Sequence, residues 1–153
     1  METTIVLLKK FIDLGYKKII TTPHVMSDYY KNNPQIILSG LNNVRKEIKK
    51  QNLNIEIEAA AEYNLEPEFE NLLDDGKLLS FGAEKYLLFE LSFFDEPLRL
   101  NETIWKMIEK VFMQVLGYVE RYAYWHKDYD KIEEMINIGV KIQLNISSVT
   151  GAY

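Results

Sequence analysis

The chain has 153 residues and a formal charge of −5, with 47% hydrophobic and 27% charged residues, which predicts a single folded domain over residues 1–153. The absence of cysteine excludes disulfides, thiolate metal ligands and a cysteine nucleophile. The acidic charge argues against a general nucleic-acid binder. No stretch approaches the roughly 18 apolar residues of a membrane span, and no signal-peptide pattern is present, so we expect a cytoplasmic protein without membrane insertion.

The first predicted elements are a helix and a short strand. Apolar residues at helical spacing predict a helix that ends at Gly15; they are Ile5, Leu8 and Ile12. A β-branched apolar run over residues 18–22 then predicts a strand that stops at Pro23, with His24 just past it. A histidine in this place either binds a ligand or makes a structural hydrogen bond.

The second helix and strand have clear boundaries. Asn33 and Pro34 predict the cap and first position of a helix that runs to about Lys50. Its apolar face consists of Ile37, Leu41, Val44 and Ile48. An alternating stretch over residues 53–61 predicts a strand that leads to Glu62. The basic residues late in the helix suit its solvated last turns, so they do not indicate a nucleic-acid site; they are Arg45, Lys46, Lys49 and Lys50.

The middle of the chain predicts a short helix over residues 67–73 and a strand over residues 85–91 that contains Glu90. The aromatic loop 92–97 that follows either covers a site or packs in the core. Asn101 is expected to cap the next helix.

The stretch from Thr103 to Leu116 contains no Gly, Pro or Asn, so it admits either one long helix or a helix followed by a strand. We predict the second, with a strand over residues 115–119 that leads to Glu120 and Arg121. A helix over residues 129–136 closed by Gly139 and a last strand over residues 140–146 complete the pattern. Five strands that alternate with helices predict a parallel α/β fold.

Ligands bind beyond the carboxyl ends of parallel strands, where His24, Glu62, Glu90 and Arg121 would gather. An imidazole with two carboxylates suits Mn²⁺, Zn²⁺ or Fe, and carboxylate-rich sites favour Mn²⁺ or Mg²⁺. The planar fork of an arginine can hold two phosphate oxygens. The alternative is that both glutamates are solvated or salt-bridged strand ends and that Arg121 pairs with one of them.

Four motifs occur in order: Ile19-Ile20-Thr21-Thr22-Pro23-His24, Ala61-Glu62-Tyr63, Phe89-Glu90-Leu91-Ser92 and Glu120-Arg121-Tyr122. In these motifs, and on to Gln143–Gly151, the chain resembles the polymerase and histidinol phosphatase superfamily. Within it, the chain is most similar to the capsular-polysaccharide type of bacterial protein-tyrosine phosphatase.

The resemblance implies a distorted (β/α)₇ TIM-like barrel whose strand ends hold a metal cluster, usually Mn²⁺. It implies that His24, Glu62 and Glu90 are metal ligands and that Arg121 holds the phosphate. The implied reaction is hydrolysis of phosphotyrosine through a metal-activated water. The implied partner is a phosphotyrosine protein, a bacterial tyrosine kinase that controls polysaccharide export.

The chain departs from the family pattern in several places. The family's first strand, with a His-x-His pair, and its late Asp-x-His motif are not found in these 153 residues. We therefore expect a domain that lacks the first strand and the C-terminal units. Either these residues are part of a longer enzyme, or the open sheet edges pair with another copy in a homo-oligomer. Tyr118 stands where relatives carry a histidine ligand, and His126 is interpreted as a loop residue.

These departures leave three functions open. The first is a metal-dependent protein-tyrosine phosphatase. The second is a catalytically degenerate binding or scaffold protein on the same fold. The third is a small-molecule phosphatase of the histidinol-phosphate kind, since no residue pattern reports the size of the substrate.

Overall fold

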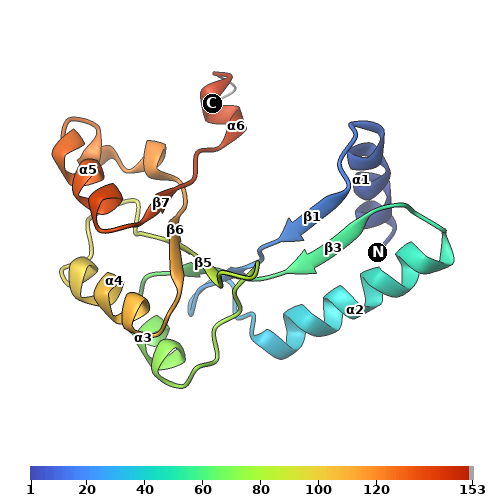
Figure 1. Ribbon diagram of the computed structural model, residues 1–153, viewed down its shortest axis with the longest axis horizontal. Helices are drawn as coiled ribbons and strands as arrows, with labels where there is room; N and C mark the ends of the chain where they lie inside the picture. Colours follow the sequence, from blue (N-terminus) through green and yellow to red (C-terminus); the bar gives the residue numbers. More distant parts are fainter. Residues whose placement is uncertain (152–153) are drawn as a thin grey trace.

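The computed structural model describes residues 1–151 and shows parallel strands flanked by helices (Figure 1). A two-stranded parallel sheet pairs β1 (Lys18–Thr21) with β3 (Glu56–Ala59). A five-stranded parallel sheet has the order β2-β4-β5-β6-β7. Its strands are β2 (His24–Val25), β4 (Glu62–Asn64), β5 (Tyr86–Glu90), β6 (Met113–Leu116) and β7 (Lys141–Ile142). The predicted parallel α/β fold is confirmed.

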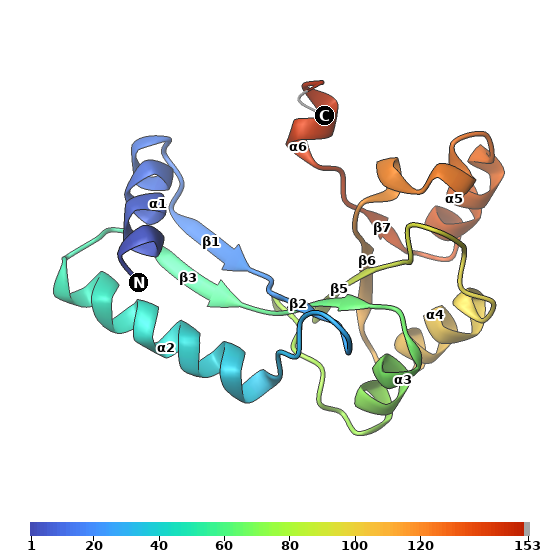
Figure 2. The same cartoon turned by 180° about the vertical axis from the view of Figure 1, so that it is seen from behind.

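The connections between strands carry the helices. The longer ones are α1 (Glu2–Asp13), α2 (Pro34–Lys50), α3 (Pro67–Asp74), α4 (Leu100–Glu109) and α5 (Tyr129–Asn137). Two short 3₁₀ helices, η1 (Val119–Arg121) and η2 (Ala123–Trp125), follow β6, and α6 (Ile146–Val149) follows β7. Seen from both sides, α1 and α2 lie beside β1 and β3, whereas α3, α4 and α5 lie along one side of β5, β6 and β7, and α6 stands apart (Figures 1 and 2).

The two sheets are joined where β1 leads into β2 and β3 leads into β4, and the chain bends at both places. Thr22 and Pro23 separate β1 from β2, and Ala60 and Ala61 separate β3 from β4. The pairing continues through this bend, because the Ala60 amide donates to Thr21 O at 3.0 Å and the Glu62 amide donates to Pro23 O at 3.1 Å. His24 and Glu62 therefore begin their strands opposite each other, where the sequence placed them beyond the strand ends.

Two apolar clusters mirror this division. One packs α1 and α2 on β3 through Ile5, Leu8, Leu41, Ile48, Ile55 and Ile57. The larger one fills the space between β4 to β6 and the later helices, and its fully buried members include Phe69, Leu73, Phe89, Met107 and Met135. Burying side chains of this size contributes about 1.5–3 kcal/mol each, so the larger cluster gives the site a rigid base.

Several predicted boundaries are confirmed. Asn33 caps α2, with its side chain accepting from the Ile36 amide at 2.9 Å, and Pro34 is the first helical residue. The stretch from Thr103 to Leu116 is a helix followed by a strand; Val111, at φ 64°, ends the helical path without a glycine.

Other boundaries were wrong. Asn101 lies inside α4, whose N-cap is Arg99. The strand predicted over residues 115–119 is β6, Met113–Leu116, and Val119 belongs to η1. The strand predicted over residues 140–146 is only β7, Lys141–Ile142. Within residues 1–151 the sheet does not close into a barrel, because β2 and β7 are both edges of the five-stranded sheet. Over that same range, no helix has the length and apolar content needed to cross a bilayer.

Candidate metal centre

Three side chains predicted from the sequence meet where neighbouring ends of the strands β2, β4 and β5 form one edge of the sheet. His24 begins β2, Glu62 begins β4 and Glu90 ends β5, and each offers one ligand atom within 4.8 Å of the others. His24 Nδ1 lies 2.9 Å from Glu90 Oε1, and His24 Nε2 lies 3.9 Å from Glu62 Oε2. Both carboxylates are buried, and His24 is half-buried. The imidazole therefore lies between two carboxylates.

Burial makes ionisation of the two carboxylates costly. Desolvation, opposed by the charge of His24 and reinforced by that of Glu90, raises the pKa of Glu62 to about 7. Desolvation likewise raises the pKa of Glu90, against the lowering effects of His24 and Arg121. A cation at this edge would favour the ionised form of both groups.

One oxygen in the cluster is short of a partner. Glu62 Oε1 is buried and accepts no hydrogen bond from any residue in 1–151. Buried polar atoms are normally satisfied, so an orphan oxygen calls for an ion or a water. With one imidazole and two carboxylates around it, the donor set fits Mn²⁺, Zn²⁺ or Fe.

A glycine makes room for this carboxylate. A Cβ added to Gly117, just after β6, would lie 2.9 Å from Glu62 Oε1 and 3.6 Å from Gln143 Oε1. Gln143 is held there because its backbone amide donates to Leu116 O at 2.9 Å. Neither residue was predicted from the sequence as a site residue. The position of Gln143, within the predicted last strand and at the start of the last matching stretch, was the available signal.

The Gly117→Ala variant tests this packing. The added methyl group must displace the Glu62 carboxylate, so we expect divalent-metal affinity to fall by about tenfold, with a loss of stability of about 1 kcal/mol. Titration calorimetry with Mn²⁺ measures the first and thermal unfolding the second. The Gly40→Ala variant is a matched control, because a Cβ on this helical glycine of α2 meets nothing within 4 Å. Unchanged metal affinity in Gly117→Ala would contradict the assignment.

Arg121 lies in η1 after β6 and borders the same edge, since its charge lowers the pKa of Glu90. Its guanidinium carbon lies 4.9 Å from the ring centre of Phe93 and 5.3 Å from that of Tyr118. The ring of Tyr118 in turn lies parallel to His24, with 6.4 Å between the ring centres. The structure thus places all four predicted site residues at one edge.

Tyr122 holds the strand ends together, a role the sequence analysis missed. Its buried hydroxyl accepts from the Leu91 amide at 2.9 Å and donates to Gly117 O at 2.7 Å. The end of β5 and the turn after β6 are thereby tied to one phenol. Glu90 directly precedes Leu91, and Gly117 packs against the Glu62 carboxylate. Tyr122 therefore fixes the spacing of the centre.

Glu120 and His126 lie outside the centre. Glu120 Oε1 accepts from the Asn145 amide at 3.2 Å and from Ser148 Oγ at 2.8 Å, and so holds the start of α6. Burial opposes ionisation of Glu120, but these hydrogen bonds, with one from its own amide, lower its pKa overall. His126 is exposed and its Nε2 lies 3.1 Å from Glu120 O, which fits its interpretation as a loop residue.

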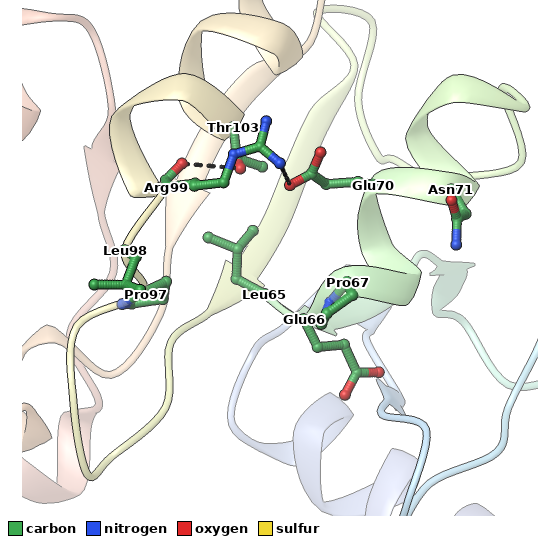
Figure 3. A pocket seen from close by; sticks show the side chains of 9 residues that line it. All are labelled: Leu65, Glu66, Pro67, Glu70, Asn71, Pro97, Leu98, Arg99 and Thr103. Carbon is green, nitrogen blue, oxygen red and sulfur yellow. Dashed lines mark hydrogen bonds and ion pairs between the residues drawn. The ribbon is translucent and has the colours of Figure 1, made fainter.

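A hollow lies at the starts of α3 and α4 (Figure 3). It has a volume of about 470 Å³ and lies near Leu65, whose amide donates to Glu90 O at 2.9 Å. Arg99 and Glu70 face each other across it with N and O atoms 3.6 Å apart. The hollow is therefore partly apolar and edged by a salt bridge.

Comparisons with known proteins identify relatives of the chain. The family model described as capsular polysaccharide synthesis, CpsB/CapC, matches residues 1–153. The tyrosine-protein phosphatase YwqE of Bacillus subtilis is 24% identical over 139 residues, which are 91% of this chain and 55% of YwqE. The putative tyrosine-protein phosphatase CapC of Staphylococcus aureus is 24% identical over 155 residues, covering 100% of this chain and 60% of CapC.

The fold has a counterpart among solved structures. A chain from the crystal structures of YwqE from Bacillus subtilis and CpsB from Streptococcus pneumoniae, described as unique metal-dependent tyrosine phosphatases, superposes with a TM-score of 0.86. The match has 23% sequence identity and covers 96% of this chain and 60% of that one. The present chain thus spans less than two thirds of the length of these relatives.

Proposed function

We propose that the chain, which belongs to the CpsB/CapC family of capsular polysaccharide synthesis, forms the metal- and phosphate-binding part of a protein-tyrosine phosphatase. The observation that carries the proposal is the cluster of His24, Glu62 and Glu90, in which the buried Glu62 Oε1 lacks a partner among residues 1–151. The names of YwqE and CapC as tyrosine phosphatases support the substrate class.

In this proposal His24, Glu62 and Glu90 hold a divalent metal, for which Mn²⁺ is our first choice ahead of Zn²⁺, Fe or Mg²⁺. When bound, such a metal supplies an activated water and neutralises phosphate charge. Glu90 orients the imidazole of His24 through the 2.9 Å contact at Nδ1, which leaves Nε2 on the side of Glu62. Arg121 donates in-plane hydrogen bonds to two phosphate oxygens.

The wider setting follows from family membership. We propose that the parallel sheet is part of a distorted (β/α)₇ barrel and that residues 1–153 act as one domain. The proposed substrate is a phosphotyrosine protein, namely a bacterial tyrosine kinase of polysaccharide export, and the proposed location is the cytoplasm. The edge strands β2 and β7 would pair with further strands, those of a second copy included.

Hydrolysis of a phosphotyrosine peptide by the purified protein with added Mn²⁺ tests the function. We expect turnover that is lost on chelation and restored by Mn²⁺. The two histidines provide a matched pair: His24→Gln should reduce turnover by at least about 100-fold, because it removes a ligand. His126→Gln should leave turnover unchanged, because His126 is exposed and outside the cluster.

One observation favours a second candidate, a non-catalytic binding protein. The described residues bring together a single group of three ligands, and Tyr118 lies next to His24 where the resemblance predicts another histidine. Folded protein without turnover in Mn²⁺ that still retains a partner after chelation would support this candidate and overturn the phosphatase proposal.

A further inference from the structure

The guanidinium carbon of Arg121 lies over the faces of two aromatic rings. It lies 4.9 Å from the ring centre of Phe93 and 5.3 Å from that of Tyr118. The two rings meet edge to face, with centres 6.0 Å apart and planes at 83°. Contacts of this kind attract a cation to the face of a ring within about 6 Å. Phe93 and Tyr118 thus form an aromatic corner around one cationic group.

The corner rests on fixed parts of the fold. The ring of Phe93 packs on Tyr122, with centres 5.9 Å apart, and Tyr122 is fully buried with its hydroxyl bound at both sides. Tyr124 OH donates to Ser92 O at 2.8 Å, which holds the residue before Phe93. Tyr118 follows Gly117 with φ at 59°, a left-handed conformation that sets the direction of its side chain. The ring of Phe93 is thus supported by a buried residue of the core.

Contacts with two nearly perpendicular rings confine an arginine side chain in more than one direction. Because the two ring planes lie at 83°, the guanidinium can lie parallel to only one of them and turns an edge of its plane toward the other. Its N–H groups lie in that plane and match the spacing of phosphate oxygens. A ring corner therefore fixes the orientation of the fork and reduces the entropy lost when an anion binds. An arginine held only by flexible side chains would lose more on binding.

We infer that Phe93 and Tyr118 are positioning residues that hold Arg121 ready to bind a phosphate beside the cluster of His24, Glu62 and Glu90. The inference rests on the proposed function of Arg121. It gives Tyr118 a role in a position where the resemblance predicts a metal ligand, and it gives the aromatic loop 92–97 a role at the site rather than in the core.

The first measurement needs neither metal nor activity. Protons near the face of an aromatic ring are shielded, so the side-chain resonances of Arg121 should lie upfield in the wild-type protein. They should move toward ordinary values in Phe93→Leu and Tyr118→Leu. The neighbouring ring of Phe94 is 94% exposed, so Phe94→Leu is the matched control and should leave the Arg121 resonances in place. Unmoved resonances in both test variants would overturn the inference.

The second measurement is the affinity of the Mn²⁺-loaded protein for inorganic phosphate by titration calorimetry. We expect Phe93→Leu to weaken phosphate binding about threefold and the Phe93→Leu, Tyr118→Leu double variant about tenfold. Phe93→Tyr and Tyr118→Phe keep an aromatic face and should retain wild-type affinity. Mn²⁺ affinity should stay the same in Phe93→Leu.

A double-mutant cycle with Arg121→Ala separates this inference from the proposed function. If the rings act through Arg121, Phe93→Leu should cost nothing further once Arg121 is alanine. A full additional loss in that background would overturn the positioning role. If Arg121→Ala itself leaves phosphate affinity unchanged, the proposed function of Arg121 fails, while the resonance measurement still decides whether the rings hold the guanidinium.

Discussion

The Glu90→Ala variant is expected to bind Mn²⁺ more than about 100-fold more weakly than the wild-type protein. Glu90 offers one of the three ligand atoms and also fixes the ring of His24 through the 2.9 Å contact at Nδ1. Removal of a group that only orients a ligand typically costs 10- to 100-fold in metal affinity, on the order of 1–3 kcal/mol. Loss of a ligand and of its orienting contact together should exceed that range. Titration calorimetry of the chelator-treated protein measures the affinity.

Three further variants make this result interpretable. Glu90→Gln keeps the shape and one oxygen, so it should fall between alanine and wild type. Glu109→Ala removes an exposed carboxylate at the end of α4 and should leave Mn²⁺ affinity unchanged. Because Glu90 is buried, thermal unfolding of each variant must show that the fold persists. Wild-type affinity in a folded Glu90→Ala protein would count decisively against the proposed ligand set.

Local patterns predicted that His24, Glu62 and Glu90 meet better than they predicted the bounds of the strands that carry them. His24, Glu62 and Glu90 were predictable because each adjoins a short apolar run, and parallel strands bring such positions to one edge. The bend that separates β1 from β2 and β3 from β4 was not predictable. It depends on Ala60 and Glu62 amides finding carbonyl partners on Thr21 and Pro23, about 40 residues away in the chain.

The missed residues act at long range. Gly117 matters through the space it leaves for Glu62, and Tyr122 through bonds to Leu91 and Gly117. Neither property appears in the spacing of apolar residues, which reports only which face of an element is buried. The wrong cap at Asn101 has a similar cause, since its side chain donates to Glu134 Oε1 of α5 at 2.9 Å instead of capping its own helix. Tertiary contacts decided all three cases.

The stability of the metal-free protein should fall as pH rises from about 4.5 to about 7. Burial raises the pKa of Glu62 to about 7, from a model-compound value of 4.5. Within this window the folded state keeps a proton that the unfolded chain has released, so rising pH favours unfolding. The Glu62→Gln variant has no such proton to lose. It should match the wild type near pH 4.5 and be more stable by about 1–3 kcal/mol at pH 8.

Urea unfolding of both proteins at several pH values, with chelator present, measures this difference. Added Mn²⁺ should reverse it at pH 8: the metal binds the ionised carboxylate in the folded state and so stabilises the wild type, whereas Glu62→Gln has lost a ligand. The reversal separates the two explanations of a buried glutamate. If the Glu62 carboxylate merely supports the fold, Glu62→Gln should lower the stability of the protein at every pH, with or without Mn²⁺. If Glu62 is instead a metal ligand, its ionised carboxylate should destabilise the metal-free protein at pH 8 and stabilise the protein that has bound Mn²⁺.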